Sequence, residues 1–274
     1  MKKPGPDFAR RYGPWSLVIG AAEGLGAAFA EALAEVGLNL VLVDRQSEKL
    51  ADTADRLRRA YGHEVREAVV DLTEDDFLVQ ISGATQGLEI GLLICNAALG
   101  EVGPFEDSDL ASLLAIVDVN VKAPLALTHT YGRAMVQRGR GGIIVLASNS
   151  AYHGTPYVAH YAATKAYNLV LGEGLWFEWA RYGVDVMAFA PGATNTPGLR
   201  RAKPGLIAGR KSRGVMQPED SARAALAALG KVPSARPGVL ETLQTFFLTR
   251  ILGRHRAVRV AGAYIRKNLE STKT

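Results

Sequence analysis

The feature that constrains the fold most is an alternation of short apolar runs with helix-length segments between residues 16 and 191. Residues 16–20 (SLVIG) are an apolar run that ends in glycine, and residues 24–37 repeat apolar side chains at helical spacing. Further strands are expected at 38–44, 64–71, 89–96, 141–148 and 184–191, and further helices at 47–62, 74–86, 108–138 and 159–182. Several of these strands are apolar on both faces. The sequence therefore predicts an α/β fold, a doubly wound parallel sheet covered by helices, as one domain over residues 1–274.

Residues 192–274 do not continue this alternation. The stretch 197–216 is rich in Gly, Pro, Lys and Arg, which predicts a substrate lid that orders when ligands bind; an ordinary surface loop is the alternative. A helix is expected at 218–230, followed by a short apolar run at 238–243, a basic apolar segment at 245–269, and overall a basic C-terminal helical extension over residues 241–274. Residues 245–260 fit a membrane-surface helix or, as the favoured alternative, a helix that packs on the substrate loop or another subunit.

The net charge of +5 is unevenly distributed, because residues 200–274 hold 16 Lys and Arg against 4 Asp and Glu. No nucleic-acid-binding motif accompanies this basic region, so we expect a solvated surface and no nucleic-acid partner. No uninterrupted apolar run approaches the roughly 18 residues of a membrane span, and residues 1–15 lack the apolar stretch of a secretory signal. The single cysteine, Cys95, is expected to be a small buried hydrophobe, which fits a reducing cytoplasm.

A glycine turn, GAAEGLG (residues 20–26), stands between the first strand and the first helix. At such a turn the backbone can approach a pyrophosphate, and the free N–H groups of the helix start favour its negative charge. Asp44 ends the next strand, near the spacing at which a carboxylate receives the 2′-hydroxyl of an NAD ribose. NAD is therefore favoured over NADP, with Glu23 as a second acid. Arg45 is the counterargument, because a guanidinium there could hold a 2′-phosphate.

Tyr161 and Lys165 are four residues apart in a helix-forming segment, so their side chains lie on one face. A lysine ammonium beside a phenol favours the phenolate, and we expect it to lower the pKa of Tyr161 from a value near 10, as an acid/base acting on an alcohol requires. Ser148 ends a parallel strand, at the edge where such sheets bind ligands, and its hydroxyl could hold the reacting oxygen. Other tyrosines and histidines here are assigned to the substrate loop or to packing: Tyr152, Tyr157, His153 and His160.

Taken in order, these motifs resemble the short-chain dehydrogenase/reductase family over about residues 14–230. The matching positions are the glycine turn, Asn96, Asn120, Ser148, Tyr161, Lys165 and the segment PGATNT at 191–196. Residues 12–43 are most similar to the branch with 17-beta-hydroxysteroid dehydrogenases and long-chain 3-oxoacyl reductases. Two features depart from the family pattern: Ile19 replaces a Thr, and Cys95 and Ala98 alter the usual Asn-Asn-Ala-Gly. These differences bear on the rigidity of the turn and on cofactor affinity.

The resemblance implies a role for each matching position in a Rossmann-type oxidoreductase. Tyr161 would be the general acid/base and Lys165 would bind the nicotinamide ribose; Ser148 would orient the substrate oxygen. Asn120 would hold a water for proton relay. The residues implied in cofactor binding are Gly20, Gly24, Leu25, Gly26, Asp44, Arg45, Asp71, Leu72, Asn96, Lys165, Pro191, Gly192, Thr194 and Thr196. Among them, Asp71 would contact the adenine, Asn96 would support the ribose side of the pocket, and Thr196 would contact the nicotinamide carboxamide. No metal site is expected.

The sequence thus predicts an NAD-dependent oxidoreductase, with NADP as the second possibility, that interconverts a secondary alcohol and a ketone. Apolar and aromatic residues in 149–158 and 197–216 favour a hydrophobic or aromatic substrate: a steroid-like or arylalkyl alcohol, or an acyl chain. The alternatives are a catalytically silent cofactor-binding regulator and a membrane-surface lipid or 3-oxoacyl reductase. The resemblance also implies a homo-oligomer, a dimer or tetramer, paired through the helices at 108–138 and 159–182.

Overall fold

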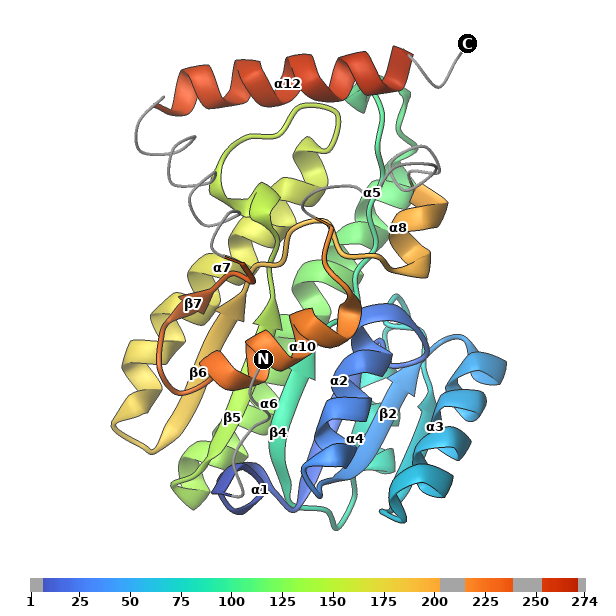
Figure 1. Cartoon of the computed structure of the whole chain (residues 1–274), viewed down its shortest axis with the longest axis vertical. Coiled ribbons are helices and arrows are strands. Elements are labelled where there is room, and N and C mark those ends of the chain that lie inside the picture. The colour runs from blue at the N-terminus through green and yellow to red at the C-terminus, as the bar shows by residue number, and fades with distance from the viewer. Residues whose placement is uncertain (1–6, 203–214, 239–252, 271–274) are drawn as a thin grey trace.

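A computed structural model of the chain describes residues 7–202, 215–238 and 253–270. Seven strands form one sheet in the order β3-β2-β1-β4-β5-β6-β7, and every pair of neighbours runs parallel. The strands are β1 (Trp15–Ile19), β2 (Asn39–Asp44), β3 (Val65–Val69), β4 (Ile90–Cys95), β5 (Gly141–Leu146), β6 (Val184–Phe189) and β7 (Ser234–Ala235). This is the doubly wound Rossmann-type sheet that the sequence predicts, and its order reverses between β1 and β4 (Figure 1).

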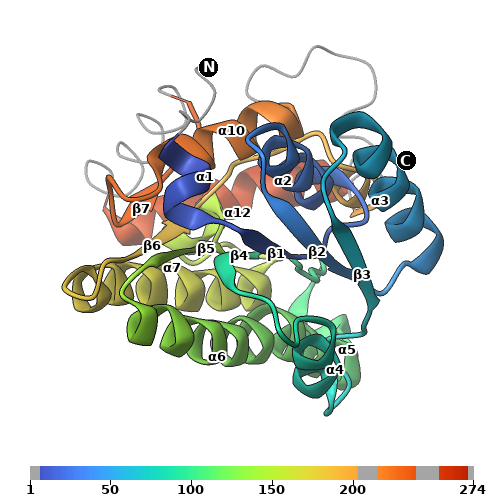
Figure 2. The ribbon, with the colours of Figure 1, turned by 90° about the horizontal axis from the view of Figure 1, so that it is seen from below.

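Helices cover both faces of the sheet, as Figure 2 shows in a view from below. One face carries α1 (Asp7–Tyr12), α2 (Gly24–Glu35), α3 (Ser47–Tyr61) and α10 (Pro218–Ala228). The opposite face carries α4 (Phe77–Ala84), α6 (Ala123–Arg138) and α7 (Ala159–Ala180). Strands β1, β4 and β5 are buried along their whole length because they lie between these two helical layers.

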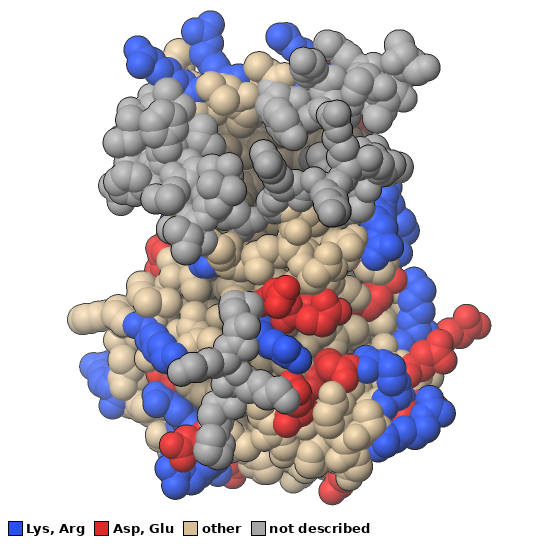
Figure 3. All heavy atoms as spheres, viewed as in Figure 1, with Lys and Arg blue, Asp and Glu red and all other residues tan. Residues whose placement is uncertain are grey.

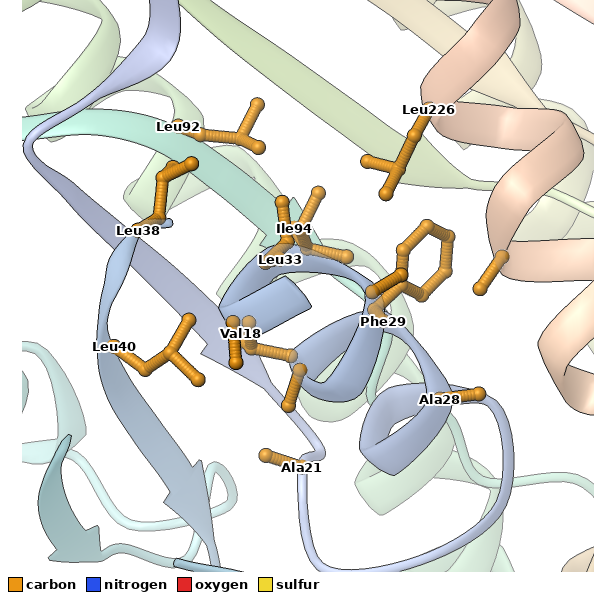
Figure 4. Close-up of a cluster of buried hydrophobic side chains, with 14 of the residues drawn as sticks. Val18, Ala21, Ala28, Phe29, Leu33, Leu38, Leu40, Leu92, Ile94 and Leu226 are labelled. Carbon is orange, nitrogen blue, oxygen red and sulfur yellow. The ribbon is translucent and has the colours of Figure 1, made fainter. Parts of the chain in front are cut away.

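The core between the sheet and α2 fixes the position of the glycine turn. Phe29 and Leu33 of α2 point between Val18 of β1 and Leu226 of α10 (Figure 4). None of these four side chains is more than 2% exposed. Burying such side chains stabilises the fold by roughly 1.5–3 kcal/mol each. The start of α2, and with it the turn that follows β1, is therefore held rigidly against the sheet.

The elements predicted between residues 16 and 230 begin and end within about three residues of their predicted bounds, apart from the helix at 108–138. The predicted helix 108–138 is observed as α5 (Leu110–Val117), a π-helical turn (Asp118–Lys122) and α6, which follow one another directly. Helix α1 was not predicted. The last strand, β7, precedes the apolar run expected at 238–243, of which only Gly238 is among the described residues.

The continuous helix Leu110–Arg138 is long and apolar enough, by length and composition alone, to cross a membrane. The sequence analysis expected no membrane span because it considered only uninterrupted apolar runs, whereas a membrane-spanning helix can contain a few polar residues. The helix carries Asp118 and Lys122 in its π-helical turn, and α6 packs against β4 and β5. Leu127 and Met135 on that inner face are fully buried. The α6 part of this helix therefore packs on the sheet.

The C-terminal region contains two further helices. Helix α8 (Pro197–Ala202) opens the predicted lid, whose residues 203–214 lie outside the described part of the chain. Helix α12 (Arg254–Glu270) crosses the upper end of the molecule in Figure 1, and basic side chains line the same edge in Figure 3. It packs on the loop before α7: Gly154 faces Val258, and a methyl group at Gly262 would lie 3.0 Å from Pro156 Cγ. This agrees with the favoured alternative for 245–260, of which 245–252 lie outside the described residues.

Candidate active site

The predicted catalytic side chains converge at the carboxyl ends of the central strands. Ser148 follows β5 and begins a short 3-10 turn (Asn149–Tyr152). Tyr161 and Lys165 lie on the first turns of α7, which packs on β5 and β6. Asn120 lies in the π-helical turn between α5 and α6, and its carbonyl oxygen accepts a hydrogen bond from a side chain of α7. Three separate segments therefore supply one site, as expected for this edge of a parallel sheet.

Lys165 is fixed in place by burial and by one hydrogen bond. Its side chain is 2% exposed, and Nζ donates to the carbonyl oxygen of Leu146 at 2.9 Å. The ammonium lies 5.8 Å from the centre of the Tyr161 ring, so the two side chains share one face of α7 as the spacing predicts. Burial lowers the pKa of Lys165 to about 8, because the charged form loses its hydration.

The pKa of Tyr161 does not follow the sequence-based prediction. Burial raises the pKa of this phenol, and the nearby Ser148 hydroxyl opposes that rise. The net lowering predicted from Lys165 is not found, because burial of the phenol raises its pKa. In this arrangement Tyr161 is a neutral phenol, the form that donates a proton to a substrate oxygen.

Asn120 is held by hydrogen bonds within the protein. Its Oδ1 accepts from the backbone N–H of Leu99 at 2.8 Å, and its Nδ2 donates to the Leu99 carbonyl at 2.8 Å and to Thr164 Oγ1 at 3.0 Å. The side chain is thus committed to tying the loop after β4 to α7. A relay water would have to use the Asn120 backbone carbonyl, which already accepts a hydrogen bond from Asn168 Nδ2. The relay role itself stays a prediction.

Two further polar residues of the site, Thr164 and Asn168, were missed from the sequence. Asn168 is 1% exposed and donates from Nδ2 to the Asn120 carbonyl at 3.0 Å and to the Leu146 carbonyl at 3.3 Å. Asn168 therefore shares one acceptor with Lys165 and joins it to Asn120. A sequence signal existed: Asn168 follows Tyr161 by seven residues and Lys165 by three, which places all three on one helical stripe.

The glycine turn fits the pyrophosphate of a dinucleotide. Gly20 and Gly24 have positive φ angles of 80° and 62°, which favour glycine. A methyl group at Gly26 would lie 1.8 Å from the Gly20 carbonyl oxygen, so only glycine allows this close approach. The residue before α2, Glu23, makes no side-chain cap to the helix, and the N–H groups of the first turn remain available for an anion.

The turn is well braced although Ile19 lacks the hydroxyl of the family's usual threonine. The backbone N–H groups of Gly20 and Ala21 donate to the Val43 carbonyl, at 2.7 and 3.1 Å. Asn96 Nδ2 donates to the Gly20 carbonyl at 2.9 Å, across from β4. Asn96 thus supports the turn itself, together with the two backbone bonds to Val43.

The residues predicted around the adenosine ribose lie together at the ends of β2 and β3. Asp44 accepts hydrogen bonds from the backbone N–H groups of Ala22 and Gln46, at 3.0 and 3.1 Å. Asp71 accepts from Thr73, and these bonds hold the pKa of its carboxyl below the ordinary value. The Arg45 guanidinium lies 3.6 Å from the Asp71 carboxylate. Arg45 is therefore paired with an acid rather than directed at a free anion site.

The segment after β6 closes the site on its other side. The Pro191 carbonyl accepts from the Asn149 N–H at 3.1 Å, and the Thr194 hydroxyl donates to the Gly192 carbonyl at 3.2 Å. Thr196 Oγ1 accepts from the Leu199 N–H at 3.1 Å and so caps α8. Its side chain lies over Gly24, where a methyl group would come within 3.1 Å of Thr196 Cβ. Leu25 is partly exposed beside this contact, whereas Leu72 is buried.

The remaining aromatic and histidine side chains lie around the substrate loop. Tyr152 packs on the Ala147 cluster under the guanidinium of Arg236, 4.0 Å from the ring centre. Tyr157 has a positive φ of 65° and lines a small cavity beside Tyr161. His160 interacts with the Leu113 carbonyl at 2.8 Å and is structural rather than solvated. As predicted, Cys95 is buried, and burial raises the pKa of its thiol to about 12.

Fold and site together define an oxidoreductase of the classical dinucleotide-binding type, with a Ser-Tyr-Lys set beside a glycine turn. The short-chain dehydrogenase family model matches residues 14–205, which is most of the sheet and all of the predicted catalytic residues. The chain belongs to the short-chain dehydrogenase/reductase family.

Among relatives, a 7beta-hydroxysteroid dehydrogenase of Clostridium sardiniense is 34% identical over 225 residues, which cover 82% of this chain and 85% of that protein. A very-long-chain 3-oxoacyl-CoA reductase-like protein of Arabidopsis thaliana is 33% identical over 248 residues, covering 89% of this chain and 78% of that protein. Both fit the branch of the family that residues 12–43 resemble.

Solved structures agree with this placement. One solved for work on 7beta-hydroxysteroid dehydrogenase stereoselectivity superimposes with a TM-score of 0.87 at 29% identity, covering 93% of this chain and 98% of that one. A short-chain dehydrogenase from Sphingobium yanoikuyae in complex with NADPH has a TM-score of 0.74 at 28% identity, covering 86% and 96%. Similar folds of this family thus bind nicotinamide dinucleotides.

Proposed function

We propose that this protein interconverts a secondary alcohol and a ketone on a hydrophobic, steroid-like substrate, with Tyr161 as the general acid/base. The observation that carries this proposal is the convergence of Ser148, Tyr161 and Lys165 at the carboxyl ends of the sheet, next to the glycine turn. The bound nicotinamide would supply or accept the hydride. The protein residues would position the substrate and move its proton.

Each catalytic side chain has a distinct task in this mechanism. In ketone reduction the neutral Tyr161 hydroxyl donates its proton to the carbonyl oxygen, and Ser148 donates a hydrogen bond to the same oxygen as its charge develops. Lys165, held by the Leu146 carbonyl, stabilises the phenolate that remains. In alcohol oxidation the steps run in reverse. Asn168 shares the Leu146 carbonyl with Lys165 and also donates to the Asn120 carbonyl, so it would help to hold Lys165 in position.

NAD is the proposed cofactor, with NADP as the alternative. Asp44 supports NAD, because its carboxylate lies at the end of β2, where a 2′-hydroxyl would be accepted and a 2′-phosphate repelled. The neighbouring Arg45 is turned to Asp71. The complexes of similar structures with NADPH favour the alternative. Fluorescence titrations of the purified protein with NADH and with NADPH decide between the two, since a Kd for NADPH at or below that for NADH would reject the NAD proposal.

The proposal of a steroid-like substrate rests on the relatives and on the lining of the site. The two most relevant relatives act, by their names, on hydroxysteroids and on long acyl chains. Tyr157, Phe105, Leu113 and Ile116 line the small cavity beside Tyr161, together with the polar residues Glu101, Ser108 and His160.

A substrate screen with a matched pair of variants tests the activity. Hydroxysteroids, arylalkyl alcohols and 3-hydroxyacyl thioesters are offered with NAD⁺, and turnover is followed as NADH absorbance. Tyr161→Phe should slow turnover by about 10²–10⁴-fold, the usual contribution of a general acid/base. Tyr152→Phe, a change to another tyrosine of the same segment, should leave turnover within about threefold. Equal rates in wild type and Tyr161→Phe would favour the catalytically silent regulator instead.

Exposed apolar side chains on two helices support a homo-oligomer. Leu110 and Leu114 of α5 and Val170 and Phe177 of α7 are between 56% and 76% exposed. Exposed apolar side chains of this kind are often covered by a second copy of the same chain. Light scattering should give at least twice the monomer mass, and a monomer at micromolar concentration would reject this proposal. The cytoplasmic location and the absence of membrane binding stay predictions.

A further inference from the structure

Tyr157, in the loop before α7, has a backbone conformation that suits its side chain poorly. Among the described residues it is the only one other than glycine with a positive φ, 65°. This left-handed region brings the Cβ atom too close to the following carbonyl oxygen, so it favours glycine. Strain of this kind persists only where the surrounding structure imposes it, and it is concentrated at functional sites. The outlier therefore asks for a function of the Tyr157 side chain.

Contacts with three other segments hold the strained backbone in place. The Tyr157 carbonyl accepts a hydrogen bond from the Gly103 N–H at 2.9 Å, which joins it to the loop that follows β4. The preceding residue, Pro156, packs near Gly262 of α12, the helix that lies over this loop in Figure 1. Helix α7 begins two residues later, at Ala159. The position of the Tyr157 side chain is thus set before any substrate binds.

The side chain of Tyr157 lines the small cavity beside Tyr161, together with Phe105 from the loop after β4. Phe105 is 62% exposed, although it is a large apolar residue. Two aromatic rings from two loops, tied to each other by the bond between Gly103 and Tyr157, therefore lie next to the proposed general acid/base. A substrate that packs against both rings would remove their exposed apolar surface from water.

We infer that Tyr157 is a specificity-determining residue, which selects substrates that carry a rigid ring next to the reacting carbon. This inference rests on the proposed function, because it concerns the substrate of the same site. A rigid ring can pack on the phenol ring at a low cost in entropy, since neither partner has to be ordered on binding. A flexible acyl chain would lose rotational freedom at the same place. Steroid-like and arylalkyl alcohols are therefore favoured over acyl chains.

The test compares two secondary alcohols with the same number of carbon atoms, the fused-ring α-tetralol and the open-chain 2-decanol, as substrates of the full chain with NAD⁺. The quantity measured is the ratio of their kcat/KM values. Tyr157→Phe keeps the aromatic ring and should leave this ratio within about threefold of the wild-type value. Tyr157→Ala and Tyr157→Gly remove the ring, and each should lower the preference for α-tetralol about tenfold. In the matched control, Tyr152→Ala, the ratio should not change, because Tyr152 packs on the Ala147 cluster.

The alanine and glycine variants also test the strain, independently of any substrate. Both lack the ring, but only alanine keeps a Cβ atom. Tyr157→Gly should unfold at a higher urea concentration than Tyr157→Ala, because relief of the left-handed strain exceeds the extra entropy that glycine loses on folding. If Tyr157→Ala is as stable as Tyr157→Gly or more stable, the backbone is not strained and the inference loses its basis.

Calorimetric titration with the corresponding ketones, α-tetralone and 2-decanone, gives the preference without turnover, because the chain is saturated with NAD⁺, which cannot reduce them. If Tyr157→Ala leaves the ratio of the two Kd values unchanged, or if the wild type binds neither ketone, the inference is wrong. If the ratio shifts toward 2-decanone as expected but the wild type oxidises no alcohol, the proposed function fails and the role of Tyr157 stands. The two failures are therefore distinguishable.

Discussion

The substitution Lys165→Met tests whether the buried charge of this lysine destabilises the fold while it supports catalysis. The lysine is 2% exposed, and burial lowers its pKa from the ordinary 10.5 to about 8. That difference corresponds to about 3 kcal/mol of destabilisation by the charged form at neutral pH, at about 1.4 kcal/mol for each pKa unit. Methionine has a similar length without charge. The carbonyl of Leu146, the only hydrogen-bond acceptor of Lys165 Nζ among the described residues, keeps a second donor in Asn168 Nδ2.

We therefore expect the free energy of unfolding of Lys165→Met at pH 7 to exceed that of the wild type by up to about 3 kcal/mol, although turnover should fall at least 100-fold. The difference in unfolding free energy between the variant and the wild type should decrease as the pH rises. Because the folded-state pKa lies below the unfolded one, the unfolded wild type binds more protons between pH 8 and 10.5. Wild-type stability therefore rises relative to the variant across this window. The advantage of the variant should shrink to nearly zero by about pH 10.5.

Urea unfolding followed by circular dichroism at pH 7, 8.5 and 10 measures this difference. Lys122→Met, a change to an exposed lysine of the π-helical turn, serves as the control and should show no such pH-dependent gain. If Lys165→Met is less stable than the wild type at pH 7, the lysine is not a net cost to the fold. If the difference stays constant from pH 7 to 10, the lowered pKa of Lys165 is wrong.

Three further substitutions test the glycine turn and the buried polar side chain Asn168 of α7. Gly26→Ala should abolish NADH binding at millimolar concentration, because its methyl group would lie 1.8 Å from the Gly20 oxygen; retained binding by fluorescence would contradict this geometry. Asn96→Ala should weaken NADH binding about tenfold, since it removes the 2.9 Å bond that braces the turn, and an unchanged Kd would mean that the backbone bonds suffice. Asn168→Leu should lower kcat at least tenfold and leave KM within about threefold, if Asn168 links Lys165 to the Asn120 carbonyl; an unchanged kcat and pH profile would make its role structural.

Most of the fold could be predicted from the sequence because the interactions that define it are local or periodic. The apolar runs and the helical repeats give strands and helices whose bounds agree with the structure to within about three residues. The short strand β7 and the helix α1 were missed, since a two-residue strand and a six-residue helix carry no periodic signal and are stabilised by packing. The π-helical turn at Asn120 was missed for a similar reason: its sequence, DVNVK, differs little from that of an ordinary helix.

Part of the site could also be predicted. Tyr161 and Lys165 share a face because helical spacing places them there, and Ser148 lies beside them because it ends a central strand. The prediction for the pKa of Tyr161 was wrong, because it considered the charge of Lys165 and not the burial of both groups. Burial depends on what packs against a residue, and that is a property of the assembled chain.

The sequence by itself determined which residue types stand at the strand ends and turns, and hence the parallel sheet, the glycine turn and the Ser-Tyr-Lys set. Only the tertiary structure decided which charges meet. Glu23, Lys49 and Arg201 are separated by 26 and 152 residues in the chain, yet they form one network because α2, α3 and α8 converge at the carboxyl edge of the sheet. Asn168 likewise acquired a role only when α7 was packed on β5. Helical and strand periodicity act over a few residues, whereas electrostatic and hydrogen-bond partners are chosen by the packing of distant segments.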